Sequence, residues 1–237
     1  MTTTSTSQEQ DRDAPVWTGD AVDYDAWFDT PWGHHAFTVE SAAVRRACGD
    51  LAGRRLLDAG CGTGRVSATL VDHHTTVVGV DPDPAMLDLA RTRTTAGCCA
   101  RAAIEHLPFP DGAFDLTLAV TVLEFVAHPA AALAELARVT RNGGRIVIGA
   151  LNPHSPWGLA NRRRLRTGVW CHARFLSRSE LQALGTPHGR TSLHGALYAP
   201  GVLPGLSRIG PLLETAGPAA PGWGAFQVLA IDKDRHP

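Results

Sequence analysis

The sequence predicts an α/β fold in which helices cover both faces of a mostly parallel, doubly wound sheet. One observation is that short β-prone segments alternate with segments whose apolar residues recur at helical spacing, as in repeated strand–helix–strand units. Another is that a glycine-rich turn follows the first buried strand, while an acidic residue ends the second. Such a sheet binds its ligand beyond the carboxyl ends of its strands, where the strand order reverses.

The expected elements follow from apolar periodicity and from turn residues. In chain order they are a helix at 35–48, a strand at 54–58, a helix at 65–72, a strand at 75–80, a helix at 83–94, a strand at 114–120, a helix at 129–139, a turn at 142–144 and a strand at 145–148. Cys98 and Cys99 fall in a further strand, the third, with one side chain expected in the core.

The alternation of strand-like and helix-like segments breaks after residue 151. Ser177 and Glu180 have the spacing of a capping box, so a helix is expected to begin near Ser177. Residues 199–222 are rich in glycine and proline and predict a long loop, whereas 223–231 are β-prone and predict a strand that returns to the sheet. We therefore expect a disordered tail at 1–20, lid helices at 21–50, and one main domain at 51–237 with a cap insertion at about 152–190.

Composition excludes several classes of protein. The chain has 237 residues, of which 44% are hydrophobic and 19% charged, and its net charge of −1 gives no reason to expect nucleic acid or an anionic membrane as partner. It has no apolar run near the roughly 20 residues that cross a bilayer. Its first residues are Thr/Ser/Gln-rich, unlike a signal peptide, and its five cysteines contain no Cys-x-x-Cys pair. We expect a reduced, cytoplasmic protein with no disulfide framework, no metal site and no membrane insertion; the oligomeric state stays open.

The glycine turn is the first candidate binding motif. Gly60, Gly62 and Gly64 alternate within the turn, where backbone must approach a ligand closely or adopt positive φ. Asp81 ends the next strand, about 20 residues later, and its carboxylate suits two ribose hydroxyls. The alternative for Asp81 alone is a helix cap.

Two features separate this motif from a dinucleotide site. The glycines lack the Gly-x-Gly-x-x-Gly spacing, and Asp58 precedes the turn. A carboxylate there would disfavour a pyrophosphate but could receive an ammonium group or orient the loop.

Four segments together carry a family resemblance: Leu56–Gly64, Gly79–Asp81, Leu107–Asp115 and Asn142–Gly144. They resemble class I S-adenosylmethionine (SAM)-dependent methyltransferases, and the nearest group is the small-molecule type of ubiquinone and menaquinone biosynthesis (methyltransferase type 11 domain). The segments occur in the family's order and cover about residues 22–150, while residues 151–222 match loosely.

The resemblance implies a Rossmann-like, seven-stranded sheet with its last strand antiparallel. It also implies cofactor-binding residues. The methionine part of SAM would lie on Gly60, Cys61 and Gly62, the ribose on Asp81, and the adenine between Pro82 and Met86. Family members often have Asp-Ala-Glu where this chain has Ala103, Ile104 and Glu105, so adenine recognition would depend on the Ile104 backbone and on apolar packing.

Val120, Thr121 and Glu124 follow the fourth expected strand, where the family's cofactor and acceptor sites meet. For Glu124 two interpretations stay open, a residue of this site and a solvated carboxylate at a helix end.

Aromatic residues before the first helix form a second candidate motif. Tyr24, Trp27 and Phe28 could fold over the cofactor as a lid, with Tyr24 donating to the SAM carboxylate, or could fix an N-terminal helix to the core. Both roles are compatible.

A general base is needed only if the acceptor nucleophile holds its proton tightly. His34, His35, His154, His172 and His194 are candidates because imidazole titrates near neutrality, with His34 and His154 ranked first and Tyr24 as a further weak candidate. The basic run at 162–166 is interpreted as a solvated helix face, or alternatively as an attraction for an anionic substrate.

The leading hypothesis is an enzyme that moves the methyl group of SAM to a small-molecule acceptor by in-line displacement, releasing S-adenosylhomocysteine (SAH). A non-catalytic SAM-binding partner or regulatory subunit is the alternative, and a nucleotide-dependent oxidoreductase is the third hypothesis.

Overall fold

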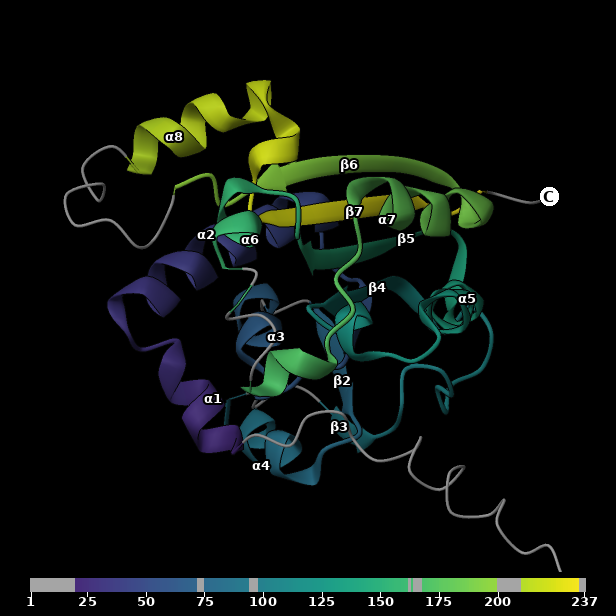
Figure 1. Cartoon of the computed structure of the whole chain (residues 1–237). Helices are drawn as coiled ribbons and strands as arrows, with labels where there is room; N and C mark the ends of the chain where they lie inside the picture. The colour runs from purple at the N-terminus through teal and green to yellow at the C-terminus, as the bar shows by residue number, and fades with distance from the viewer. Residues whose placement is uncertain are drawn as a thin grey trace, which may run out of the picture.

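A seven-stranded sheet forms the centre of the computed structural model, which describes residues 20–71, 75–93, 98–161, 163, 168–199 and 210–234 (Figure 1). Its order is β3-β2-β1-β4-β5-β7-β6. The strands are β1 (Arg55–Ala59), β2 (Thr76–Asp81), β3 (Cys98–Arg101), β4 (Phe114–Val120), β5 (Thr140–Leu151), β6 (Arg190–Ala196) and β7 (Phe226–Asp232).

The sheet is parallel from β3 to β5, and the last strand, β7, pairs antiparallel with both β5 and β6. This confirms the fold class that the sequence predicts, including the antiparallel last strand. The chain order reverses between β1 and β4, which are direct neighbours. The carboxyl ends of these two strands therefore mark the expected ligand site.

Helices cover both faces of the sheet. They are α1 (Ala21–Trp27), α2 (Pro31–Cys48), α3 (Arg65–Leu70), α4 (Pro84–Arg93), α5 (Pro129–Val139), α6 (Pro156–Ala160), α7 (Arg178–Gly185) and α8 (Gly210–Ala216), with 3₁₀ turns that include η2 (Leu123–Phe125), η4 (Gly168–His172), η5 (Thr186–His188), η7 (Gly217–Ala219) and η8 (Pro221–Trp223). Figure 1 shows α2 and α3 on the opposite side of the sheet from α5 and α7.

Two hydrophobic clusters fill the two interfaces between sheet and helices. On one face α5 buries Leu133, Leu136 and Val139, the stripe that the sequence predicts, against the strands. On the other face α2 buries Ala36 and Val44. The sheet is thereby enclosed on both sides, as a mostly parallel sheet requires.

The glycines at 142–144 lie within a strand and not in the predicted turn. β5 runs through them, with Gly143 at φ 70°. A Cβ on Gly144 would lie 2.8 Å from the carbonyl oxygen of Asp115, so glycine is needed where β5 passes this close to β4. The register between β4 and β5 shifts at the same place, between Phe114 and Leu116. The pair of glycines thus marks an irregularity in the sheet. In the sequence alone, such a pair looks the same as a turn.

Further sequence predictions concern the ends of single helices and strands, and one long loop. Ser177 and Glu180 form the predicted capping box at the start of α7. α2 begins at Pro31, earlier than predicted, because the Thr30 side chain caps it by accepting from the Gly33 amide. The predicted loop at 199–222 is partly wrong, since α8, η7 and η8 lie within it. β7 begins at Phe226, three residues later than its predicted start.

Cys98 and Cys99 lie in β3 as predicted, but neither is fully in the core. Cys98 is exposed, and Cys99 is partly buried against a small cluster of Cys61, Leu87 and Ala90. β3 is the edge of the sheet, which explains its lower burial.

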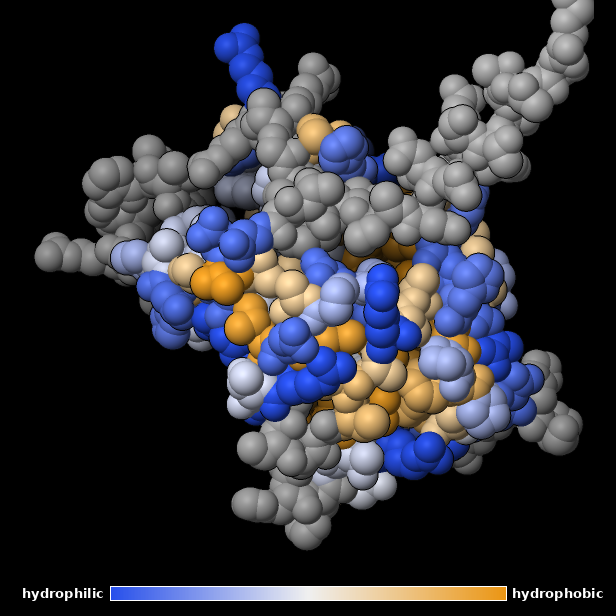
Figure 2. All heavy atoms as spheres, turned by 90° about the horizontal axis from the view of Figure 1, so that it is seen from below, coloured by the Kyte–Doolittle hydropathy of each residue, from blue (hydrophilic) through white to orange (hydrophobic). Residues whose placement is uncertain are grey.

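Parts of two predictions lie outside the described residues, namely the N-terminal tail up to residue 19 and most of the basic run, although Arg163 is described and exposed. Within the described ranges, no helix is both long and apolar enough to cross a membrane. On the face that Figure 2 shows, hydrophobic side chains lie among hydrophilic ones and gather toward its middle.

Candidate functional site

The glycine turn joins β1 to α3 at the carboxyl edge of the sheet. Gly60, Gly62 and Gly64 have φ of 76°, 52° and 78°, values that other residues adopt only with strain. The Gly60 and Cys61 amides both donate to the carbonyl of Val80, at 2.7 and 2.9 Å, so the turn is held against the end of β2.

The space around the turn differs from glycine to glycine. A Cβ on Gly60 would lie 2.4 Å from the side chain of Val122, and one on Gly64 would lie 3.1 Å from Ala90. A Cβ on Gly62 would meet no atom within 4 Å. Packing therefore excludes a side chain at Gly60 and leaves little room for one at Gly64, whereas the position of a side chain at Gly62 is open space, although Gly62 itself is half-buried. This is the geometry of a backbone cradle for a ligand.

Asp81, at the end of β2, cross-links this turn. Its Oδ2 accepts from the Gly62 amide and its Oδ1 from the Asp83 amide, both at 2.9 Å. Burial raises the pKa of the Asp81 carboxyl, against the lowering effect of these two hydrogen bonds. Each oxygen keeps a second lone pair, so the carboxylate is able to accept two hydroxyl groups as well.

Asp58 is buried beneath the turn and not directed at solvent. Its side chain accepts a hydrogen bond from the Ser67 hydroxyl in the first turn of α3. Burial raises the pKa of Asp58 to about 7, although the Ser67 hydrogen bond acts in the other direction. Of the two roles that the sequence allows for Asp58, this contact supports orientation of the loop.

The residues predicted to surround an adenine lie together after β2 and β3. Met86 and Ile104 are each 5% exposed, whereas Pro82 is exposed. The Ala102 amide donates to the Asp81 carbonyl at 3.3 Å, which brings Ala103, Ile104 and Glu105 to the same edge of the sheet. Ala103 is exposed and Glu105 half-buried.

The segment after β4 contacts the glycine turn through Val122. Just before it, Thr121 has φ 53°, and its amide donates to the Gly149 carbonyl at 2.8 Å. Val120 and Thr121 are half-buried. Glu124 is only 1% exposed, so the interpretation of it as a solvated helix-end carboxylate is wrong.

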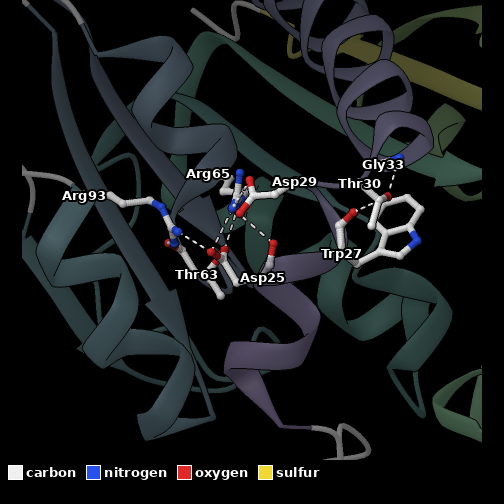
Figure 3. Close-up of polar contacts among 8 residues, drawn as sticks. All are labelled: Asp25, Trp27, Asp29, Thr30, Gly33, Thr63, Arg65 and Arg93. Carbon is white, nitrogen blue, oxygen red and sulfur yellow. Dashed lines mark hydrogen bonds and ion pairs between the residues drawn. The ribbon is translucent and has the colours of Figure 1, made fainter.

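An ion-pair network connects α1 to the glycine turn (Figure 3). Asp25 accepts from the Thr63 hydroxyl at 2.6 Å, from Arg65 Nε at 2.8 Å, and from Arg93. Arg65 also reaches Asp29, at 3.0 Å. Burial alone would raise the pKa of Asp25, but the hydrogen bonds from Arg65, Thr63 and Arg93 lower it to about 2. The carboxylate is thus a charged link between the lid helix and the loop.

The aromatic residues join α1 to α2. Phe28 makes edge-to-face contacts with Tyr24 at 5.1 Å, with Trp27 at 5.0 Å and with Phe37 at 5.6 Å between ring centroids. Trp27 is 42% exposed, and in Figure 3 its indole points away from the Asp25 network. These contacts support the role of fixing the N-terminal helix, in which Trp27 is the outermost member.

Tyr24 faces the interior. Burial, followed by the carboxylates of Glu40, Asp81 and Asp25, raises the pKa of its hydroxyl well above the usual range. The residue as a whole is half-buried, and its ring packs on Phe28.

The candidate bases among the histidines lie at the surface. His34, His154, His172 and His194 are exposed, and His35 is half-buried beside Trp32. Among the described residues, no group of three or more His, Cys, Asp or Glu side chains could hold a metal ion.

Sequence reasoning missed two site residues, Asp25 and Glu40. Asp25 stands within the aromatic motif, but its partners are 38 to 68 residues away along the chain. The helical periodicity of α2 could have identified Glu40 from the sequence. The buried residues of α2 include Gly33, Ala36, Val44 and Cys48, and Glu40 occupies the missing position of that stripe.

Comparisons with known proteins agree with this geometry. A family model described as a methyltransferase domain matches residues 57–148. An uncharacterized protein of Mycobacterium tuberculosis is 34% identical over 231 residues, which cover 92% of this chain and 76% of the relative. A malonyl-[acyl-carrier protein] O-methyltransferase of Serratia marcescens is 43% identical over 99 residues, which cover 42% of this chain and 39% of that enzyme.

Solved structures give the same result. A SAM-dependent methyltransferase of Thermotoga maritima, a possible histamine N-methyltransferase, superposes with a TM-score of 0.73 and 26% identity over 90% of this chain and 95% of its own. A geranyl diphosphate C-methyltransferase of Streptomyces coelicolor, solved with SAH, has a TM-score of 0.61 and 20% identity over 86% and 80% of the two chains. The finer resemblance to the ubiquinone and menaquinone type stays a prediction.

Proposed function

Because this chain belongs to the class I SAM-dependent methyltransferases, we propose that it transfers the methyl group of SAM to a small-molecule acceptor. When bound, SAM supplies a methyl group on a sulfonium centre, which a nucleophile attacks in line. The protein contributes by holding the two reactants in that alignment and by excluding water.

The observation that supports this function most is the pairing of the glycine turn with a carboxylate. The position of a side chain at Gly62 is open space, and the Gly62 amide is already fixed by Asp81. We infer that the methionine part of SAM lies along Gly60, Cys61 and Gly62 and that Asp81 accepts the ribose hydroxyls. Met86 and Ile104 supply apolar surface for the adenine, with Pro82 at its outer edge.

Two further groups prepare this site. Asp58 fixes the start of α3 through Ser67, so that the turn keeps its shape without the ligand. Asp25 holds α1 against the turn and thereby keeps Tyr24 over the site. In this arrangement α1 acts as the lid that excludes water.

Small-molecule acceptors are supported by neighbours that act on them, such as the geranyl diphosphate enzyme. The relative from Serratia marcescens is named for an acceptor on a carrier protein, which is the contrasting class. A SAM-binding partner without catalysis is the remaining candidate, and it predicts cofactor binding with no turnover.

Calorimetric titration and methyl transfer test the proposal together. We expect SAH to bind the purified protein and NADH not to bind. Asp81→Asn should weaken SAH binding at least about tenfold, because it replaces a charged acceptor by a neutral amide. Asp88→Asn, which removes an exposed carboxylate on α4, is the matched control. Labelled SAM with a panel of phenols, amines, thiols and carboxylic acids then measures turnover. Binding of NADH alone would overturn the cofactor, and SAH binding without transfer to any acceptor would favour the non-catalytic alternative.

A further inference from the structure

A buried carboxylate lies beside the cofactor turn and is only half satisfied. Glu124, in η2, is 1% exposed. Its Oε1 accepts from the Leu151 amide at 2.8 Å, and its backbone carbonyl accepts from the Arg174 amide. Its Oε2 is buried and has no hydrogen-bond partner among the described residues. Glu124 follows Val122, the residue that packs on Gly60. Glu124 is thus two residues along the chain from the side chain that packs on the glycine turn.

A second buried acceptor belongs to a side chain that also contacts the backbone of Leu151. Gln227, in β7, is fully buried, and its Nε2 donates to the Leu176 carbonyl at 2.8 Å and to the Leu151 carbonyl at 3.5 Å. These contacts assign the amide orientation and leave Oε1 without a partner among the described residues. Glu124 accepts from the Leu151 amide and Gln227 donates to the Leu151 carbonyl, so both unsatisfied acceptors belong to side chains that contact this one residue. Buried acceptors of this kind call for a donor.

A third acceptor, Glu40, comes from α2. Glu40 is half-buried and lies one helical turn after Ala36 and one before Val44, which are both buried. Burial, followed by the nearby Glu124 carboxylate, raises the pKa of Glu40 to about 8. Burial raises the pKa of Glu124 to about 7. No arginine or lysine in the described part of the chain forms an ion pair with either residue. We call Glu40 and Glu124 the carboxylate pair.

We propose that the methyl acceptor is a primary or secondary amine and that the carboxylate pair binds its nitrogen. This inference rests on the proposed function and names its substrate class. An ammonium group offers two or three N–H donors and a positive charge, which suits a site of acceptors without a cation. A carboxylate or phosphate acceptor would add a negative charge to this site, and a hydroxyl would bring only one donor.

The same pair accounts for the proton that N-methylation must release. The ammonium first gives one proton to Glu124, which leaves a neutral nitrogen with a free lone pair. That lone pair forms the new C–N bond while the S–CH₃ bond of SAM breaks and its electrons stay on sulfur. The products are SAH and the methylated ammonium, and the proton passes from Glu124 to water. The pKa of Glu40 is raised further than that of Glu124, which favours the neutral form of Glu40, so Glu124 is the member of the pair that takes the proton.

The test uses the full chain saturated with SAH and sets of probes that share one apolar body. One set is 2-phenylethylamine, 2-phenylethanol and 3-phenylpropionate, and a second has an imidazole ring in place of the phenyl. Calorimetry should detect binding of only the amine in each set. Glu124→Gln should weaken amine binding about tenfold or more, because the charge is lost while the Leu151 contact remains. SAH affinity should change less than twofold. Glu40→Gln should act in the same direction, and Asp88→Asn should have no effect.

Methyl transfer from labelled SAM supplies the second readout. We expect label in the amine members alone. Transfer to the alcohol or the carboxylate, with SAH bound normally, would overturn the amine assignment and leave the proposed function intact. SAH binding with no amine bound, or a Glu124→Gln variant that loses affinity for SAM but not for amines, would also overturn it. Failure of SAH itself to bind would instead contradict the proposed function. Circular dichroism of each variant confirms that it is folded.

Discussion

Replacing Asp25 with asparagine removes the charge that joins α1 to the glycine turn while nearly preserving the side chain's shape. Three residues donate to this carboxylate, namely Thr63 of the glycine turn, Arg65 of α3 and Arg93 of α4. Its side chain is 13% exposed, so solvent screens these contacts only weakly. We expect Asp25→Asn to destabilise the protein and to loosen the lid.

The magnitude follows from the pKa of Asp25, which falls from 3.8 to about 2 in the folded protein. At about 1.4 kcal/mol per pKa unit, the ionised carboxylate contributes roughly 2.5 kcal/mol to the free energy of unfolding. Folding lowers the pKa of this acid, so its contribution to stability is present at high pH and is lost at low pH. The contribution is fully present well above pH 3.8 and is lost as the pH falls through 2, so it should shrink to about half at pH 3.

Urea unfolding followed by tryptophan fluorescence measures this contribution at pH 7 and at pH 3. Asp88→Asn is the control, because the Asp88–Arg91 pair is exposed and should contribute under about 0.5 kcal/mol. Calorimetry with SAH measures how much the lid helix α1 contributes to cofactor binding, and Asp25→Asn should weaken that binding. Equal losses of stability in the two variants, or a loss at pH 3 as large as at pH 7, would refute the reasoning.

Three further predictions use other features of the site. Gly60→Ala should abolish SAH binding and lower thermal stability, because the added Cβ would strike a valine side chain. Gly53→Ala is the control, since Gly53 also has a positive φ but a Cβ there would meet open space. An equal effect of the two substitutions would contradict this prediction. Glu124→Gln should stabilise the protein by roughly 3 kcal/mol at pH 8 and by less than about 1 kcal/mol at pH 5. The reason is that a carboxyl whose pKa is raised from 4.5 to about 7 loses folding stability as the pH rises through that range. A stability difference that does not change with pH in urea titrations would count against it. In native thiol labelling, Cys98, which is exposed, should react well before Cys61, whose pKa is raised by burial, and the reverse order would be inconsistent with the structure.

The predicted stability gain of Glu124→Gln and its predicted loss of amine binding concern the same atom. A carboxylate buried without a counter-ion costs folding free energy, and a ligand that brings the counter-ion recovers it. This opposition between stability and binding is expected where a side chain is retained for its function.

The arrangement of the glycine turn and Asp81 was predictable because these residues are close together in sequence. The turn at Gly60 and Gly62 and the carboxylate of Asp81 lie on two successive strands, and parallel strands bring their carboxyl ends together. Parallel pairing therefore converts a local pattern into a spatial one. The sheet and the helices α4 and α5 followed from periodicity for the same reason, since their residues face one interface each.

The remainder depends on contacts that no local pattern encodes. Arg93 reaches Asp25 from 68 residues away, and the Glu124 carboxylate raises the pKa of Glu40 although 84 residues separate them along the chain. The irregularity of β5 at Gly144 arises from the approach of β4, which appears only when the two strands pair. In each case tertiary packing, and not propensity, decides the structure.

A crystal structure of the protein with SAH is the most direct test of how the cofactor is held. The account predicts both ribose hydroxyls on the carboxylate of Asp81 and the amino-acid end of SAH along the backbone at Gly62. A structure in which SAH lies elsewhere, or in which Asp81 keeps only its two backbone partners and contacts no sugar, would contradict it.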